Sequence, residues 1–399
     1  MDKPSADPMV YALALNSGSS SLKFGLYAAR SASVACLVSG EAERIGQQSS
    51  AFRAVDRSGQ AVCRDNAPLT AQEDVVARIS RLLVDLGAPA PQAIGHRVVH
   101  GGPALRRHCR IDDAVLRQLD AAKAFAPLHT PAVLSVIGGA LAQFRGTFQV
   151  ACFDTTFHAS MPDLARVLPL PAALRSQGIQ RYGFHGLSCE SIVQQLADAL
   201  PSRLLIAHLG NGASVTAVKD GLSIDTSMGL TPSGGLIMGT RSGDLDPGVL
   251  VYLAREKRFD AAMLEDLVDQ RSGLAGISGL DGDMRTLHAA APSNADAALA
   301  IRMFCYAVRK QLAAMWAVLD GVDGIVFTGG IGENDAAIRT EICAGLSSLG
   351  VLLDADRHRA LVNPISSAGS SCQVHVLPSL EDEQIARHTA AIATSAGPA

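Results

Sequence analysis

The chain has 399 residues, of which 48% are apolar and 18% are charged, and its net charge is −4. This length exceeds the size at which a single hydrophobic core usually suffices, so two domains are expected. The small negative charge excludes the strongly basic surface that nucleic acids or anionic membranes require. We therefore expect neither as a partner, and any anion-binding site must be built locally.

The cysteines and the apolar runs indicate the compartment. None of the eight cysteines forms a C-x-x-C pair or has zinc-ligand spacing, which favours reduced thiols. No apolar run approaches the roughly 18 residues of a membrane span. The N-terminal segment is typical of a strand and lacks the pattern of a signal peptide. The sequence therefore predicts a soluble, cytoplasmic protein.

The first predicted element is a strand, a turn and a second strand. The apolar "YALAL" leads into "NSGSSSLKF" (16–24), where small polar residues are followed by alternating Leu22, Lys23 and Phe24. Most segments of this kind are plain hairpin turns. Small side chains also allow backbone N–H groups to approach a phosphate, to which Lys23 would add a positive charge. The segment matches neither the Walker A loop nor the dinucleotide fingerprint.

Two later segments repeat this pattern. "GNGASVTAV" (210–218) superposes on residues 16–24 without a gap, which suggests a duplicated fold with a cleft between its halves. A third glycine-rich turn, in "GIVFTGGIGEN" (324–334), follows a helical segment at 295–319 with Asn294 as its N-cap and Gly321 as its stop. Residues 221–247 have no clear periodicity and read as a long functional loop. Each half is therefore α/β.

Two arginines stand among apolar or small residues. Arg97 lies in the apolar strand of "GHRVVHGG", and Arg241 lies in "MGTRSGDLDPG". An arginine in such a place either pairs with a carboxylate or binds a ligand. The pairing alternatives are Asp154, Asp244 and Asp246, and the functional alternative is a clamp on phosphoryl and carboxylate oxygens.

Histidines and acidic residues provide further candidates. Asp154 ends the apolar strand "FQVACF", and strand ends open onto crevices in α/β folds. Residues 381–383 in "LPSLEDEQIAR" either begin a helix or supply a carboxylate to Mg²⁺. Four histidines beside glycine, proline or strand ends are either core residues or functional groups: His129, His158, His185 and His208.

In order along the chain, these motifs resemble the acetate kinase family. The blocks are "NSGSSSLKF", "GHRVVHGG", "FDTTFH", "YGFHG", "HLGNGAS", "MGTRSGDLDP", "SGLAGISGLDGDMR" and "FTGGIGEN". The resemblance implies an α/β fold of two duplicated actin-like (ribonuclease H-like) domains. Each would be a mixed five-stranded sheet flanked by helices, with the active site in the interdomain cleft. The implied boundaries are 1–157 with a C-terminal helix at 386–399, and 158–385 for nucleotide binding and dimerisation.

The activity that the resemblance implies is reversible phosphoryl transfer from ATP to acetate, giving acetyl phosphate and ADP in a homodimer. Mg²⁺ would be the cofactor, with Mn²⁺ able to substitute. The implied metal residues are Asn16 and Glu381, although one way of counting along the block favours Glu383. The implied catalytic residues are Arg97, Asp154, His185 and Arg241. Acetate is already ionised at pH 7, so we expect Asp154 to orient an arginine or a metal-bound water instead of acting as a general base.

The resemblance also implies binding residues. The methyl pocket and its surroundings would be formed by Val99, Leu128, Pro232 and Phe184, beside Arg97. Residues near the phosphates would be Ser19, Ser21 and His129. The nucleotide would contact Lys23, His208, Leu209, Gly210, Asn211, Gly212, Asp283, Met284, Arg285, Gly330, Ile331, Gly332, Glu333 and Asn334.

The chain departs from the family pattern near the acyl site. Thr130 replaces the usual asparagine of one block, and "TPSGG" replaces "TPLEG" beside Pro232. A propionate or butyrate kinase is therefore an alternative, since one methylene changes preference by only about 1–3 kcal/mol. A second alternative is an actin- or chaperone-like ATPase that moves domains. Arg97 and Arg241 speak against it, because water offers no carboxylate to clamp.

Overall fold

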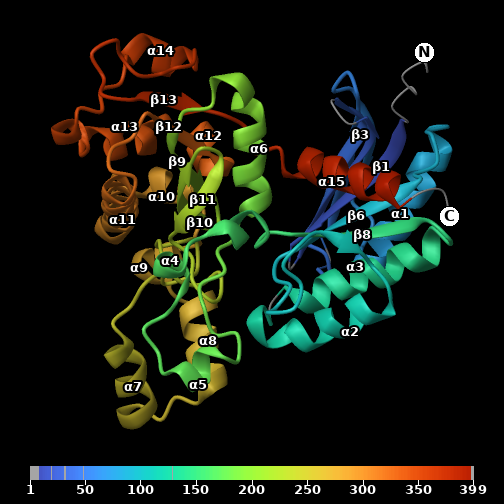
Figure 1. Ribbon diagram of the computed structural model, residues 1–399, viewed down its shortest axis with the longest axis horizontal. Coiled ribbons are helices and arrows are strands. Elements are labelled where there is room, and N and C mark those ends of the chain that lie inside the picture. The colour runs from blue at the N-terminus through green and yellow to red at the C-terminus, as the bar shows by residue number, and fades with distance from the viewer. Residues whose placement is uncertain (1–8, 19, 31–32, 48, 128, 397–399) are drawn as a thin grey trace. The chain divides into compact units, whose positions relative to one another are not determined.

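The computed structural model describes residues 9–18, 20–30, 33–47, 49–127 and 129–396 (Figure 1). Contacts divide the chain into two compact units. The N-terminal unit comprises Met1–Thr156 and Leu380–Ala399, and the C-terminal unit comprises Phe157–Ser379. Among the described residues, no helix is both long and apolar enough to cross a membrane. All eight cysteines lie among the described residues, and none of them is in a disulfide.

The N-terminal unit is a mixed sheet of eight strands in the order β5-β4-β3-β2-β1-β6-β8-β7. Its elements are β1 (Val10–Ser17), β2 (Ser21–Ala29), β3 (Val34–Glu43), β4 (Ala51–Asp56), β5 (Ala61–Asp65), α1 (Gln72–Asp85), β6 (Ala93–Val98), β7 (Cys109–Arg110), α2 (Asp113–Ala121), α3 (Thr130–Gln143), β8 (Phe148–Phe153) and α15 (Glu381–Ser395). The expectation of five strands is wrong for this unit, because β4 and β5 extend one edge by antiparallel pairing and β7 adds to the other.

Helices cover both faces of this sheet. Leu13 and Leu15 of β1 belong to a buried cluster with Val75 and Ile79 of α1. Successive residues of a strand point to opposite faces, so the residues between these leucines and their neighbours on β6 face α15. The helix lies so close to this face that a Cβ on Gly95 would be 2.0 Å from the Thr389 hydroxyl. The C-terminal helix was expected from residue 386, but α15 begins five residues earlier, at Glu381. Its first turn is acidic, which suits the positive end of the helix dipole.

The C-terminal unit contains a five-stranded mixed sheet in the order β11-β10-β9-β12-β13. Its elements are α4 (Asp163–Arg166), α5 (Ala172–Arg175), α6 (Gly186–Leu196), β9 (Arg203–Leu209), β10 (Ala213–Lys219), β11 (Leu222–Thr226), α7 (Pro247–Glu256), α8 (Ala261–Gln270), α9 (Gly273–Ser278), α10 (Met284–Ala290), α11 (Ala295–Val318), β12 (Gly324–Thr328), α12 (Gly329–Asn334), α13 (Ala336–Ala344), α14 (Ala355–Ala360) and β13 (Gln373–Val376). Helices α6 and α11 lie on either side of the sheet (Figure 1).

Several local predictions are confirmed in this unit. Strands β9 and β10 form the predicted hairpin. The side chain of Asn294 caps α11 by accepting from two backbone N–H groups, at 2.9 and 3.0 Å. The prediction of a long loop is wrong in its first part, because residues 222–226 form β11, which pairs with β10. The loop begins only after Thr226. Residues 222–226 are strand because their register continues the sheet, a non-local effect that periodicity over a short segment does not reveal.

The two sheets share a core of the same topology. Strands β3-β2-β1-β6-β8 correspond in order and direction to β11-β10-β9-β12-β13, with two antiparallel pairs followed by two parallel pairs. The α/β class and the duplication are therefore confirmed. The predicted five strands describe this shared core.

Candidate active site

Polar residues gather at one edge of the N-terminal sheet. Strands β1, β6 and β8 are parallel, so their carboxyl ends meet at this edge. Asn16 lies near the end of β1, Arg97 near the end of β6, and Asp154 directly after β8. The first turn of α15 brings Glu381 and Asp382 to the same place. The topology thus assembles residues that are up to 366 positions apart in the sequence.

Hydrogen bonds join these residues into one network. Arg97 donates from Nε and Nη2 to Oδ2 of Asp154, at 3.0 and 2.7 Å. Its Nη1 donates to Oδ1 of Asn16 at 3.1 Å. The Asn16 amide in turn donates to Oε2 of Glu381 at 3.1 Å and to Oδ1 of Asp382 at 2.8 Å. Of the alternatives for Arg97, a buried ion pair with Asp154 is therefore present, within a cluster rich in oxygen ligands.

Burial controls the ionisation of this cluster. It raises the pKa of Asp154 to about 6, against the opposing effect of Arg97. Burial would lower the pKa of Arg97, but the charges of Asp154 and Glu381 outweigh it and raise that pKa. Burial also raises the pKa of Asp382, opposed by its hydrogen bond from Asn16. Close packing of carboxylates in a buried place favours a cation among them.

One oxygen of the cluster lacks a protein partner. Oδ1 of Asp154 is buried and accepts no hydrogen bond from any described residue. An unsatisfied buried carboxylate oxygen is costly, and a metal-bound water or a bound donor would satisfy it. Carboxylate and amide oxygens are also the ligands that Mg²⁺ prefers. The residues present therefore fit this ion.

The structure distinguishes the two glutamates, Glu381 and Glu383, that the sequence offered as the metal ligand. Glu381 contacts Asn16, and its Oε2 lies 3.9 Å from Nη1 of Arg97. Glu383 instead accepts from Arg387 at 2.8 Å, four residues along α15. A difference of two positions turns a side chain by more than half a helical turn. Glu381 and Asp382 therefore face Asn16, whereas Glu383 is engaged with its own helix.

Lys23 and the other residues of the first turn lie nearby. Lys23 pairs with Asn16 in the β1–β2 register and is exposed, and its charge opposes the raised pKa of Asp382. Ser21 is exposed, and its carbonyl accepts from Gly18 N at 2.8 Å. Val99 is buried, and His129 stands at the N-cap position of α3. Two predicted site residues lie outside the described residues: Ser19 and Leu128.

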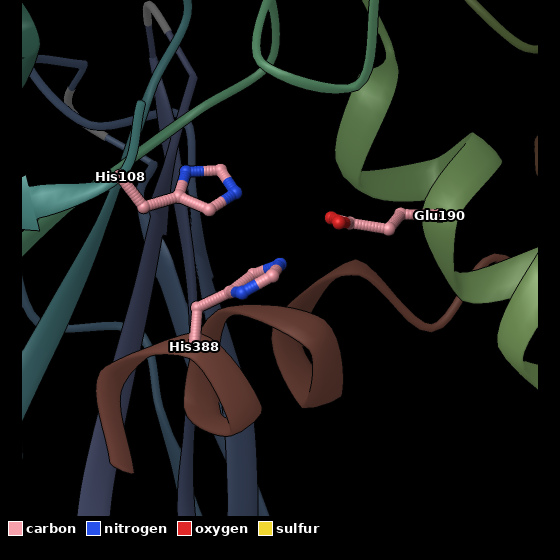
Figure 2. A group of neighbouring side chains, drawn as sticks. All are labelled: His108, Glu190 and His388. Atoms are coloured by element: carbon pink, nitrogen blue, oxygen red, sulfur yellow. The ribbon is translucent and has the colours of Figure 1, made fainter. Parts of the chain in front are cut away.

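Two histidines support the segment that carries Asp154. His108 Nδ1 accepts from the backbone N–H of Phe153 at 3.0 Å, directly before Asp154. The ring of His108 lies against that of His388 on α15, with ring centroids 4.0 Å apart and planes tilted by 44° (Figure 2). His388 in turn contacts the amide of Gln384 at 3.1 Å. Sequence reasoning did not select these two residues, which carry no local motif.

The C-terminal unit holds a second cluster around His185. This residue has φ +58° at the start of α6, a left-handed conformation that is costly outside glycine and frequent at functional sites. Its ring stacks on that of His208, with centroids 4.1 Å apart. Its Nδ1 is 3.0 Å from the hydroxyl of Ser214. A Cβ on Gly212 would lie 3.2 Å from Nε2 of His185 and 3.6 Å from Nη1 of Arg241. This cluster therefore combines an imidazole and a guanidinium beside a glycine turn.

The predicted acyl-pocket residues of this unit are buried. Arg241 Nη1 donates to the carbonyl of Pro232 at 3.2 Å, which ties the arginine to the "TPSGG" segment. Phe184 is buried, and its carbonyl lies 2.9 Å from Nε2 of His158. His158 Nδ1 is also 2.9 Å from Ser223, and burial lowers the pKa of His158 to about 4. His158 is thus a neutral core histidine.

The predicted nucleotide motifs converge in the same unit. A Cβ on Gly210 would lie 3.8 Å from Gly330 N, which places the turn at 210–212 beside the start of α12. Gly239 N donates to the Asn211 carbonyl at 3.0 Å, and a Cβ on Gly282 would meet the Gly239 carbonyl at 2.4 Å. Residue 283 follows directly, so the three motifs form one neighbourhood.

Side chains within these motifs are largely engaged with each other. Asp283 caps α10 by accepting from Arg285 N at 2.8 Å and pairs with the Arg285 guanidinium, which lowers the pKa of Asp283. Asn334 donates to the Gly330 carbonyl at 2.9 Å. Met284 is buried, while Ile331 is half-buried.

A duplicated five-strand core of this topology, with a polar cluster in each copy, is that of the actin-like class of proteins. The acetokinase family model matches residues 11–387. An acetate kinase of Deinococcus radiodurans is 42% identical, with 97% of this chain and 99% of that protein covered. One of Brachyspira hyodysenteriae is 41% identical, with 94% and 98% covered. This chain belongs to the acetokinase family.

Solved structures agree with this assignment. A propionate kinase from Francisella tularensis has a TM-score of 0.87 at 36% identity, with 96% of this chain and 99% of that chain covered. An acetate kinase from Porphyromonas gingivalis has a TM-score of 0.83 at 34% identity, with the same shares covered. The fold over nearly the whole chain is thus that of an acetate or propionate kinase.

Proposed function

We propose that this protein is an acetate kinase that transfers the γ-phosphoryl group of ATP reversibly to acetate. The observation that carries the proposal is the network of Asn16, Arg97, Asp154 and Glu381, in a member of the acetokinase family. Phosphoryl transfer needs little covalent help, since positioning and neutralisation of charge supply most of the rate enhancement.

The residues of each unit suit distinct parts of this task. In the N-terminal unit, Arg97 would bind an oxygen of the acceptor or of the transferring group, while Asp154 holds the guanidinium in place. In the C-terminal unit, Arg241 and His185 would bind phosphoryl oxygens. Ser214 lies 3.0 Å from Nδ1 of His185 and would orient its ring. Positive charge and directed donors thus act on the charge that spreads over the phosphoryl oxygens in the transition state.

Asn16 and Glu381 would hold Mg²⁺ together with Asp382. When bound, the ion would neutralise charge on the nucleotide phosphates. The Asn16 amide is linked to Arg97 on one side and to both carboxylates on the other, so it positions the ligand set relative to the guanidinium. Lys23, exposed on the neighbouring strand, adds positive charge near the phosphates.

The remaining predicted residues would bind the nucleotide and the acyl group. The turn at 208–212, residues 283–285 and the start of α12 would contact the nucleotide. Val99, Pro232 and Phe184 would surround the methyl group.

We further propose a cytoplasmic homodimer. ATP as co-substrate supports the cytoplasmic location. Exposed apolar side chains on α7, Val251 at 58% and Tyr252 at 53%, suit a subunit contact.

Propionate is the second candidate acceptor. It is favoured by the likeness to the propionate kinase of Francisella tularensis and by the altered "TPSGG" segment, whose Pro232 carbonyl holds Arg241. One extra methylene is worth about 1–3 kcal/mol in an apolar pocket, so the pocket's size decides the preference.

An acyl-hydroxamate assay tests the proposal. The protein is mixed with ATP, Mg²⁺ and hydroxylamine, with acetate, propionate or butyrate added in turn. We expect hydroxamate with acetate, at a higher kcat/KM than with propionate or butyrate. A higher value with propionate would replace acetate by the second candidate. Hydrolysis of ATP without hydroxamate from any of the three acids would overturn the kinase and favour a domain-moving ATPase.

A further inference from the structure

Glu333 of α12 has a carboxylate that is occupied by the protein itself. Its Oε1 accepts from Gly329 N at 2.9 Å, within its own motif. The same oxygen accepts from the backbone N–H of Ser379 at 2.9 Å, 46 residues away. Two backbone donors on one carboxylate oxygen form a strong, charge-assisted arrangement. A carboxylate so placed is not directed at an anionic nucleotide, which it would repel.

The backbone that carries Glu333 is itself fixed. Arg339 is 1% exposed, and its Nη1 donates to the carbonyls of Gly332 and Glu333 at 2.8 and 3.0 Å. Its Nε lies 3.1 Å from His358. A buried guanidinium that binds the last carbonyls of α12 holds this short helix at its C-terminal end. The Glu333 carboxylate therefore projects from a rigid support.

The segment that ends at Ser379 is held at each residue. Leu377 N donates to the Phe327 carbonyl at 3.1 Å, and the Pro378 carbonyl accepts from Gln195 at 2.9 Å. Ser379 donates from its hydroxyl to that of Ser188 at 3.0 Å. Ser188 in turn lies 2.8 Å from Nδ1 of His208. Of these bonds, the one from Ser379 N to Glu333 is the last backbone anchor before the chain leaves the C-terminal unit.

The chain passes into the N-terminal unit between Ser379 and Leu380. Glu381 follows two residues after Ser379, so their Cα atoms are at most about 7.6 Å apart, two steps of about 3.8 Å. Whatever fixes Ser379 therefore restrains the backbone that leads into the first turn of α15, from which Glu381 contacts Asn16. Without the anchor, the connector would sample more conformations, and a metal ligand would be ordered only on binding, at a cost in affinity.

We propose that Glu333 is a positioning residue for the divalent cation and acts through Ser379 on Glu381. The inference rests on the proposed function in taking Glu381 as a metal ligand. It gives the glutamate of "GGIGEN" a task in metal binding and leaves contact with the nucleotide to its neighbours. It also predicts that a change in this motif alters the affinity for a metal without altering the affinity for the nucleotide.

Binding of Mn²⁺, followed by electron paramagnetic resonance, tests the inference without turnover. Glu333→Leu removes the acceptor at similar volume, whereas Glu333→Gln keeps an acceptor oxygen. We expect Glu333→Leu to raise the Kd for Mn²⁺ about tenfold, or about 1.4 kcal/mol. Glu333→Gln should stay within about threefold of the parent. The affinity of Glu333→Leu for ADP in EDTA should also stay within about threefold. Glu265→Leu, the same change at an exposed position of α8, is the control and should bind Mn²⁺ like the parent.

Three results would overturn the inference: an unchanged Kd for Mn²⁺ in Glu333→Leu, an equal loss in Glu333→Gln, or a parallel loss of ADP affinity. If Glu333→Leu does not fold, Glu333→Asp decides, since its carboxylate is one methylene shorter and should give a similar rise in Kd. Absence of hydroxamate in the parent would sink the proposed function alone, because the Mn²⁺ series still reports on the anchor. A parent that binds no Mn²⁺ would overturn the inference itself.

Discussion

The two hairpins of this molecule, which match in sequence, differ in their turns and in their chemistry. The turn between β1 and β2 closes with Gly18 N donating to Ser21 O at 2.8 Å, and that between β9 and β10 with Gly210 N donating to Gly212 O at 2.9 Å. Each hairpin has a parallel neighbour, β6 or β12, on the side of its first strand. The turns differ by one residue in length, since Ser17 pairs with Leu22 and Leu209 pairs with Ala213, and the side chains around them differ as well.

The β1–β2 hairpin carries polar side chains, whereas the glycines of the β9–β10 turn leave space for neighbouring side chains. In the gapless superposition, Asn16 corresponds to Gly210 and Lys23 corresponds to Ala217. The Asn16 amide donates to two carboxylates, so acidic groups gather beside the first turn. Gly210 and Gly212 instead allow close approach to His208 and His185, so that donors take the place of acidic groups. The two copies of the shared core thus differ at these turns, where the first is acidic and the second presents hydrogen-bond donors.

The largest expected effect tests the acidic cluster beside Asn16 in the N-terminal unit. Glu381→Gln should raise the Mg²⁺ concentration for half-maximal hydroxamate formation about a hundredfold, because a charged ligand beside Asn16 becomes neutral. Glu383→Gln is the matched control, since Glu383 pairs with Arg387 and should change that concentration less than about threefold. Titration of Mg²⁺ at saturating ATP and acetate measures both. Equal effects in the two variants would contradict the placement of the metal.

A smaller effect tests the space in the second turn. Gly212→Ala would place a Cβ 3.2 Å from Nε2 of His185, and this ring, which stacks on His208, has little freedom to move. We expect kcat to fall about tenfold, or about 1.4 kcal/mol, with a smaller change in KM for ATP. Gly18→Ala would meet the Ser21 hydroxyl at 2.7 Å, the end of a side chain that can rotate away. Its kcat should stay within about twofold, and the reverse order would break the comparison.

How far the sequence predicts this molecule depends on how local each feature is. The hairpins and the Asn294 cap follow from residues within a few positions of each other, so the pattern was sufficient. The eight-stranded sheet was not predicted, because β4 and β5 are short, partly exposed strands at its edge. They are defined by the pairing of β4 with β3 and of β5 with β4. The partner of Arg97 required the register of β6 on β8 across 57 residues, which spacing alone does not give.

The site shows the same limit. Counting along the block favoured Glu381 in one direction and Glu383 in the other, and the start of α15 fixes which side chains face Asn16. Ser214 and Ser379 were missed because a serine in a strand or loop carries no pattern, and their roles arise from contacts with His185 and Glu333. Asp382 was recognised as part of an acidic run, but only the fold shows its bond to Asn16.

The smallest expected effect concerns a property that the two halves share. Burial lowers the pKa of His96 in β6 and of His158 in the C-terminal unit to about 4 each. Because the unfolded chain has the ordinary histidine pKa near 6.5, it binds more protons than the folded chain between the two values. The stability due to each neutral imidazole is therefore complete above pH 6.5 and is lost as the pH falls toward 4. From pH 7 to pH 6 each should cost about 0.7 kcal/mol.

Hydrogen exchange of the strand amides separates the two halves, since β6 and β9 report on different units. Both strands should lose protection on going from pH 7 to pH 6, after correction for the intrinsic exchange rate. His96→Gln should remove about 0.7 kcal/mol of that pH dependence from β6 and leave the loss in β9 unchanged, whatever it does to absolute stability. The Nε2 of His96 contacts Gln149 at 2.7 Å, so the substitution alters a sheet contact, but only the slope with pH reports titration. An unchanged slope in β6 would mean that His96 does not stay neutral in the folded sheet.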